Sequence, residues 1–192
     1  MSAPPRYFEL LDEMSVPGRW VVYQKDIDEH GRRVDPWQFK RGTLLQVEGR
    51  PMLGIAHPGI PLDFSLTELA TPVVTGRFVS LFEQLELGNE VQFIPAQVEG
   101  QTEPFFILNV LHVIRCIDDA RCEHVSYWTP EDGEPELVGK YQNVRGLKVD
   151  PARMGWLSIC RPRGWTGAII ITERIKLAME RAGITGLRLR EA

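Results

Sequence analysis

The order of hydrophobic and polar residues along the chain predicts more strand than helix. Stretches rich in β-branched and aromatic residues favour strands, and a run that is apolar on both faces is typical of a central strand covered on both sides. The run from Phe105 to Ile117 has this second character. The other expected strands are RWVVYQ (19–24), VQFIPAQV (91–98), EHVSYW (123–128), VRGLKV (144–149) and TGAIII (166–171).

Helical periodicity marks two segments, each with a cap at both ends. Thr75 is the predicted N-cap of a helix that runs to about Glu86, with Gly88 just beyond it. Thr172 caps a second helix that Gly183 ends, after which ITGLRLR returns as a strand. The residues at helical spacing are Phe78, Val79, Phe82 and Leu85 in the first helix, and Ile175, Ala178, Met179 and Ala182 in the second.

Turn and loop signals separate these elements. DEHG (28–31) predicts a hairpin turn after the first strand, although DIDEHG (26–31) also imitates a calcium loop. That imitation fails because Trp37 stands where the bidentate Glu is required. GRPMLGIAHPGIPLDF (49–64) is dense in Gly and Pro and is expected to be largely loop. Ser65 and Glu68 form an S-x-x-E capping box that predicts a short helix.

The fold class that follows is α+β, with a mixed or antiparallel sheet, a few short helices and a C-terminal strand-helix-strand. The 192 residues suit a single domain over 1–192, with possible subdomains 1–100 and 101–192. No apolar run approaches eighteen residues and no basic segment precedes an apolar one at the start, so we expect a soluble, cytoplasmic protein. Three cysteines suit reduced thiols better than a disulfide framework.

Charge is unevenly placed along the chain. Residues 140–192 carry eleven Lys or Arg against four Asp or Glu, while residues 1–139 carry eleven against twenty-two. This asymmetry indicates either a polar interaction face or a solvated surface without a specific role. An overall pI near 5.6, with no ordered alternation of basic and aromatic residues, argues against nucleic acid as a partner.

Four residues of types that bind metal ions cluster in one short segment of the chain. His112, Cys116, Cys122 and His124 lie within thirteen positions. In a strand, His112 and Cys116 share a face but stand roughly 13 Å apart, too far for one ion. We therefore expect no metal or cofactor, with Cys116 a buried hydrophobe and His112 bonded to a backbone group.

Catalytic motifs are scarce too. The chain has no G-x-S-x-G, no G-x-x-x-x-G-K-[ST], no H-E-x-x-H and no C-x-x-C. Asp118 and Asp119 are adjacent carboxylates, which on a strand point to opposite faces. We expect them to hydrogen-bond the turn after Ile117 rather than to act as acid and base.

Several motifs, taken in order along nearly the whole chain, resemble a known family. They are RW (19–20), DPWQF (35–39), GIPLDFS (59–65), PVV (72–74), ILNV (107–110) followed by Cys116 and Asp118, GK (139–140) and ERAGITGLR (180–188). The chain resembles the immunity proteins of bacterial polymorphic toxin systems, specifically immunity family eleven. The resemblance implies a cytoplasmic protein that binds and neutralises a cognate toxin, and it brings no catalytic residues.

Two interpretations of the motif residues stay open. In the favoured one, Asp63 makes a turn and Trp37 fills the core; in the other, Trp37 or Asp63 faces the toxin. The acidic loop is a further candidate contact, through Glu131, Asp132, Glu134 and Glu136. We expect stoichiometric occlusion of the toxin's active site. The alternative is an enzyme, a hydrolase or one that reverses a covalent modification, built on Asp63, His57 and His112.

Overall fold

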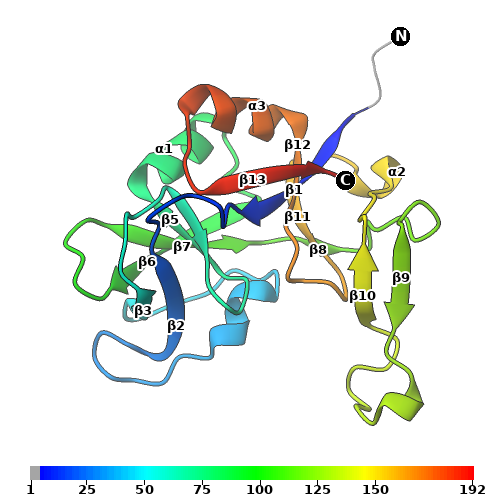
Figure 1. Cartoon of the computed structure of the whole chain (residues 1–192), viewed down its shortest axis with the longest axis horizontal. Coiled ribbons are helices and arrows are strands. Elements are labelled where there is room, and N and C mark those ends of the chain that lie inside the picture. The colour runs from blue at the N-terminus through cyan, green and yellow to red at the C-terminus, as the bar shows by residue number, and fades with distance from the viewer. Residues whose placement is uncertain (1–4) are drawn as a thin grey trace.

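The computed structural model describes residues 5–192 and shows two β-sheets, a separate two-stranded hairpin and short helices (Figure 1). Six strands form the larger sheet: β2 (Val21–Asp28), β3 (Pro51–His57), β4 (Phe64–Leu66), β5 (Pro72–Thr75), β6 (Val91–Val98) and β7 (Phe105–Val110). Their order is β2-β3-β6-β7-β5-β4. Strands β3 and β6 run parallel, and the other neighbours run antiparallel.

The second sheet joins the two ends of the described chain. Its strands are β1 (Tyr7–Asp12), β8 (Val113–Ile114), β11 (Ile159–Pro162), β12 (Ile170–Thr172) and β13 (Leu187–Glu191). In the order β13-β1-β12-β11-β8, the first strand lies between two strands from the C-terminal part. The β6–β7 pairing in the other sheet also spans the junction of residues 100 and 101. Strand pairs therefore connect the two halves of the chain in both sheets.

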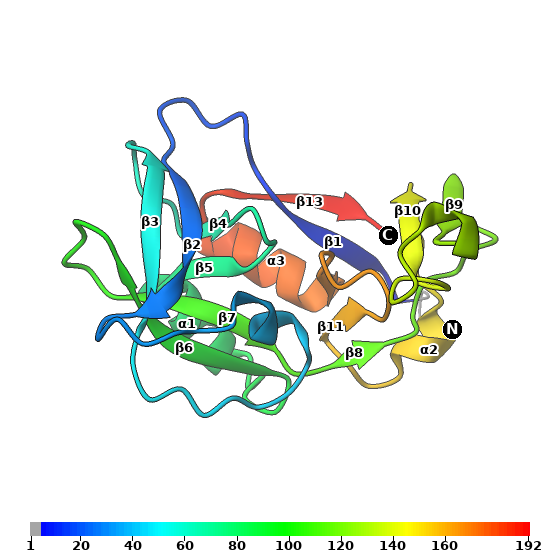
Figure 2. The same ribbon diagram turned by 90° about the horizontal axis from the view of Figure 1, so that it is seen from below.

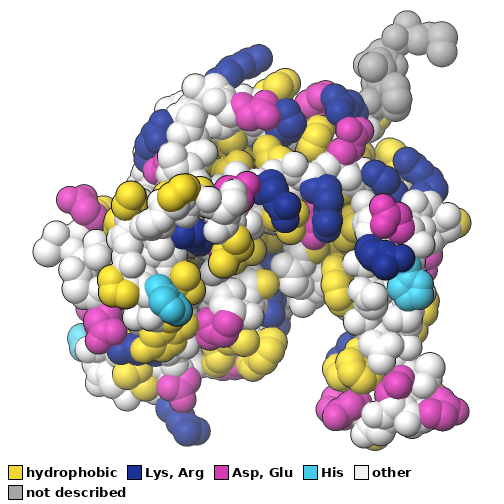
Figure 3. Space-filling view, viewed as in Figure 1, with side chains coloured by type: hydrophobic (Ala, Val, Ile, Leu, Met, Phe, Trp, Pro, Cys, Tyr) yellow, Lys and Arg dark blue, Asp and Glu magenta, His cyan; other side chains and the backbone are white. Residues whose placement is uncertain are grey.

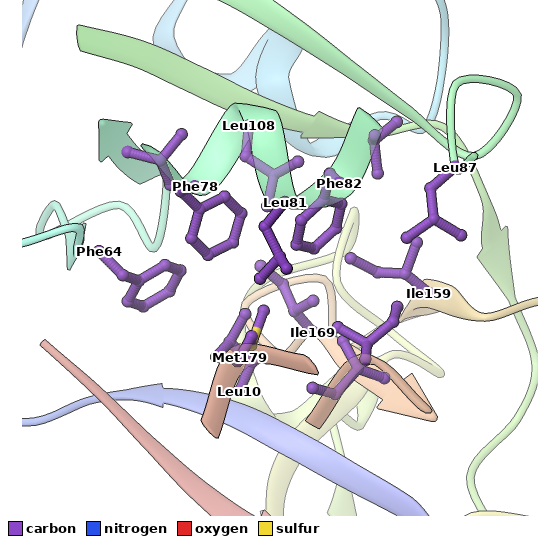
Figure 4. Close-up of a cluster of buried hydrophobic side chains, with 14 of the residues drawn as sticks. Leu10, Phe64, Phe78, Leu81, Phe82, Leu87, Leu108, Ile159, Ile169 and Met179 are labelled. Atoms are coloured by element: carbon purple, nitrogen blue, oxygen red, sulfur yellow. The ribbon is translucent and has the colours of Figure 1, made fainter. Parts of the chain in front are cut away.

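The two longer helices complete the main core. They are α1 (Gly76–Gln84) and α3 (Glu173–Ala182), and two of the shorter ones are η1 (Pro36–Lys40) and α2 (Pro151–Met154). Figure 4 shows Phe78 and Phe82 of α1 packed with Leu108 of β7 and Met179 of α3. Burying each such side chain contributes about 1.5–3 kcal/mol. Both predicted helices, the α+β class and the C-terminal β12-α3-β13 unit are confirmed.

The long apolar run predicted as one strand is interrupted. β7 ends at Val110, and the chain then crosses to the second sheet, where β8 pairs in parallel with β11. The backbone N–H of Leu111 donates to the backbone carbonyl of Glu90. The backbone N–H of Arg161 donates to the backbone carbonyl of His112 at 2.8 Å. These bonds direct the segment into the other sheet, so one apolar run supplies a strand to each of the two sheets.

Two loop-region predictions are wrong. Residues 51–57 form β3, since Gly54 leaves room for the ring of Tyr23 on the neighbouring strand. Ser65 lies in β4 rather than in a helix cap, and its hydroxyl accepts a hydrogen bond from the indole of Trp20 at 2.9 Å. In both places cross-strand pairing overrides the local signal.

A hairpin projects from the body of the protein (Figures 1 and 2). It consists of β9 (His124–Tyr127) and β10 (Tyr141–Arg145), joined by residues 128–140, which include the helix η2 (Pro130–Asp132). We call residues 124–145 the arm and residues 129–138 the arm tip. The sequence predicted a strand over 144–149, but β10 ends at Arg145. No helix within residues 5–192 is long and apolar enough to cross a bilayer.

Candidate partner-binding cleft

A cleft separates the arm from the body, and Figure 3 shows a hollow beside the projecting hairpin. Its volume is about 510 Å³. The walls come from the segment after β8, from the arm, from α2 and from the turn between β11 and β12. Its main polar and aromatic lining residues are Arg115, Asp119, Tyr127, Lys140, Tyr141 and Arg163.

An aspartate clamp ties both strands of the arm to the segment that precedes the arm. The carboxylate of Asp119 accepts hydrogen bonds from the hydroxyls of Tyr141, at 2.7 Å, and Tyr127. The two rings stack with their centroids 4.9 Å apart. Burial and the bond to Asp119 raise the pKa of Tyr141. The bond to Asp119 is also the main cause of the raised pKa of Tyr127. Both phenols therefore stay neutral donors at physiological pH.

Cations in the cleft outnumber carboxylates. Arg115, Lys140 and Arg163 make no ion pair with any residue of 5–192, while Arg153 pairs with Asp150 at 3.0 Å. The guanidinium of Arg163 makes only a long contact, 3.4 Å, with the carbonyl of Val113. The one carboxylate that lines the cleft, Asp119, is already bonded to two phenols. The cleft therefore presents unpaired positive charge to whatever enters it.

A second hollow adjoins the cleft at Arg163 and Gly164, which line both. We call it the Trp37 hollow; it measures about 430 Å³. Its lining residues include Trp37, Lys40, Arg41, Val113, Arg163 and Thr166.

Trp37 is the residue of the motif DPWQF that lines the Trp37 hollow. Asp35 accepts from the backbone N–H of Trp37 at 2.9 Å and pairs with Arg41 at 2.6 Å, so it caps η1. Phe39 is fully buried, but Trp37 is 55% exposed, and the prediction that Trp37 fills the core is wrong. The Lys40 ammonium lies 4.5 Å from the centroid of the Trp37 ring, which holds that ring on the surface.

Behind this hollow lies a buried arginine without a carboxylate partner among residues 5–192. Arg161 is 0% exposed. It donates to the carbonyl oxygens of Thr166 at 2.5 Å and Ala70 at 3.3 Å, and its Nε has no partner in the same range. Burial lowers the pKa of Arg161 to about 9. Burial, with the nearby charge of Arg161, also lowers the pKa of Lys40.

The acidic loop forms the arm tip, far along the hairpin from the core. Glu131, Asp132, Glu134 and Glu136 are all exposed, and Figure 3 shows acidic side chains gathered at this end. Asp132 accepts from the backbone N–H of Thr129 at 2.7 Å and from its hydroxyl at 2.9 Å, which lowers the pKa of Asp132. Asp132 therefore shapes the tip, while the three glutamates point into solvent without an ion-pair partner among residues 5–192.

Comparison with protein-family models identifies the chain. The model described as Immunity protein family (Imm11) matches residues 2–192, nearly the whole length. The chain belongs to this immunity protein family. A search of curated proteins finds no match. The family membership confirms the resemblance that the sequence motifs carry.

Asp63 of this immunity protein is a structural residue inside the fold. Its carboxylate accepts from the hydroxyls of Thr75 and Thr185, from the backbone N–H of Thr185 and from Arg77, at 2.9–3.0 Å. Burial raises its pKa, but the hydrogen bonds from Thr185 and Thr75 outweigh burial and lower it. The bonds join the start of β4, the junction of β5 and α1, and the loop before β13, so Asp63 of the LDFS motif cross-links these elements.

The His and Cys residues of the 112–124 segment do not converge. Cys116 is fully buried beside Cys160, with 3.9 Å between the sulfur atoms, and Cys122 accepts from the N–H of Lys148. His112 lies 3.3 Å from the carbonyl of Asn89, and His124 is exposed on the arm. Within residues 5–192 no group of three His, Cys, Asp or Glu side chains is placed to hold a metal ion.

The three residues considered for catalysis are held by separate partners. His57 is exposed at the end of β3, His112 faces Asn89, and Asp63 bonds to threonines and Arg77. No hydrogen bond joins any two of them in the described range. Their arrangement offers no paired acid and base.

The structure adds cleft residues that the sequence reasoning did not select. Arg115, Lys140 and Arg163 are far apart in sequence, and Asp119 was expected to hydrogen-bond a turn. The sequence feature that indicated a basic surface was the excess of Lys and Arg in residues 140–192. Lys140, Arg153 and Arg163 of the cleft all come from that segment.

Proposed function

We propose that this immunity protein neutralises a cognate toxin of a polymorphic toxin system by stoichiometric binding that occludes the toxin's active site, in the cytoplasm. Membership of the immunity protein family supports the partner class. The observation that carries the binding mode is the projecting arm with its charged, aromatic-lined cleft. Binding of this kind requires no cofactor, metal, membrane or nucleic acid.

The surface has the composition of a protein interface. Exposed Trp and Arg side chains supply most of the binding energy in such surfaces, and Trp37 and Arg163 line the same hollow. A stable complex buries about 800 Å² on each partner. The cleft, the Trp37 hollow and the arm tip together offer a larger contact region than either hollow alone.

The negative charge of the arm tip supports a role for the tip in the first encounter with a basic toxin. Glu131, Glu134 and Glu136 carry charge without an ion-pair partner among residues 5–192, and Asp132 holds the loop in shape. Unpaired surface charge accelerates association with an oppositely charged partner. If the toxin acts on nucleic acid, its phosphate-binding groove is the surface that this tip complements.

The test is co-expression of the chain with the product of the adjacent open reading frame. We expect cells to survive, the two proteins to copurify in a one-to-one ratio, and toxin activity to fall linearly to zero at one equivalent. The matched control is a catalytically inactive toxin, which should copurify equally well. Protection at far less than one equivalent, or no complex with either toxin, contradicts stoichiometric occlusion.

A second experiment separates binding from turnover. Replacing His57 and His112 together by Ala removes two of the three titratable side chains on which the catalytic alternative depends. Occlusion predicts that protection and binding both persist. Loss of protection by a variant that still binds the toxin would instead establish an enzymatic mechanism.

A further inference from the structure

We infer that the Trp37 hollow and the adjoining cleft receive an acidic segment of the toxin, with its carboxylates on Lys40, Lys140 and Arg163. This inference rests on the proposed function and names the partner chemistry of one surface. The acidic arm tip would then contact a different, basic part of the same toxin.

The first support is charge without compensation. Arg115, Lys140 and Arg163 make no ion pair with residues 5–192, and Lys40 is paired only with the face of Trp37. Arg115, Lys140 and Arg163 are exposed, so water solvates them in the free protein and they remain available to the carboxylates of a partner. Here they converge on two hollows that share Arg163, so a carboxylate-bearing segment meets several cations at once.

The second support is the buried charge behind the hollow. Arg161 has no solvent contact and donates to the carbonyl of Thr166, a residue that lines the Trp37 hollow. A guanidinium in low dielectric projects its field further than one in water. Because no carboxylate of the described chain neutralises it, that field favours an anion in the hollow.

The shape of the site favours a protein segment over a nucleic acid. Each hollow holds a few side chains, about 430 and 510 Å³, and Trp37 offers an apolar face beside the cations. Nucleic-acid binding depends on many contacts between cations and phosphates. This chain instead has a net charge of −4, and the tip of the arm that borders the cleft carries a row of glutamates. Those glutamates repel a phosphate backbone and attract basic parts of a protein.

The first test measures affinity for the inactive toxin by calorimetry. Lys40→Glu combined with Arg163→Glu should weaken binding about 100-fold, and Trp37→Ala about tenfold or more. The matched control is Arg181→Glu, an exposed arginine on α3 without a partner in the described range, which should change affinity less than twofold. Thermal unfolding of each variant checks that the fold is intact.

The second test identifies the contact directly. A carbodiimide couples a lysine amine to a carboxylate only where the two are in contact. We expect mass spectrometry of the treated complex to find Lys40 or Lys140 joined to Asp or Glu of the toxin. Links confined to the arm-tip glutamates and toxin lysines, with none at Lys40 or Lys140, would overturn the inference.

The outcomes separate the two proposals. If the wild-type chain does not bind the toxin, the proposed function fails. If it binds, and the Lys40→Glu, Arg163→Glu variant binds as well as the Arg181→Glu control, only the acidic-segment inference fails. Binding of an oligoribonucleotide by the wild-type chain, lost in the charge-reversal variant, would also overturn it in favour of a nucleic-acid ligand.

Discussion

The helical core and the arm hold their side chains in opposite ways. In the core, Phe78 and Phe82 stack with centroids 4.7 Å apart and have almost no solvent contact. In the arm, Val144 is the one buried residue, part of the cluster beneath the arm, and every residue of the tip except the partly buried Leu137 is exposed. The arm depends on the Asp119 clamp for its position. Stability and recognition therefore belong to different parts of the molecule, and substitutions should separate them.

The largest expected effect is in the core. Phe78→Ala removes a fully buried ring that contacts Phe64, Phe82 and Phe93, and should lower the free energy of unfolding by about 3–5 kcal/mol. Urea unfolding measures this change. The control Leu177→Ala, at an exposed position of α3, should cost about 0.5 kcal/mol or less. Equal costs for the two variants would contradict this account of the core.

Asp63→Asn should have the next largest effect, about 2–3 kcal/mol, because several of its hydrogen bonds are charge-assisted. The folded-state pKa of Asp63 lies below its ordinary value of 3.8. Its contribution is therefore present above about pH 4 and is lost as pH falls through the folded-state pKa. Unfolding at pH 7 and pH 3 should show the difference from wild type shrinking at the lower pH.

The control for that experiment is Glu83→Gln, an exposed carboxylate on α1, whose cost should be small at both pH values. A gap between Asp63→Asn and wild type that stays constant from pH 7 to pH 3 would show that the carboxylate charge is not what joins these elements.

Tyr141→Phe should cost about 1 kcal/mol and loosen the arm. Its raised pKa means that the contribution is complete below pH 10, the ordinary tyrosine value, and is lost as pH rises through the raised pKa. Hydrogen exchange at pH 7 should quicken in residues 124–145 and stay unchanged in α1. Tyr23→Phe, a half-exposed tyrosine on β2, is the control. Uniform quickening across the whole chain would mean that the clamp does not act locally.

The smallest effect on stability is expected at the arm tip. Replacing Glu131, Glu134 and Glu136 together by Lys should change the free energy of unfolding by about 0.5 kcal/mol or less. The same variant should slow association with the toxin about tenfold and weaken its salt dependence, measured by stopped flow. Glu83→Lys, far from the arm, is the matched control. An unchanged association rate with an unchanged salt dependence would show that the tip does not contribute to the encounter with the toxin.

Elements with strong local signals were predictable. The caps and apolar spacing of α1 and α3 gave both helices nearly to the residue, and the apolar runs of β6 and β12 gave strands. The failures share one cause, which is pairing with distant strands. Gly and Pro around 51–57 indicated a loop, but β2 and β6 hold that stretch as β3.

The site was less predictable than the fold. Trp37 and Asp63 were both selected as motif residues, yet their environments differ: Trp37 is on the surface, and Asp63 bonds three elements together. Sequence spacing does not distinguish these cases, because burial depends on what packs against a residue from elsewhere in the chain.

By itself the sequence determined the fold class, the two helices with their caps, the acidic loop and the likeness to immunity proteins, since each depends on neighbours within a few positions or on collinear motifs. Only the tertiary structure decided that an apolar run is shared between two sheets and that Arg115, Lys140 and Arg163 surround one cleft. The physical reason is that unpaired charge becomes a site only when chain segments far apart in sequence meet and leave no carboxylate among them.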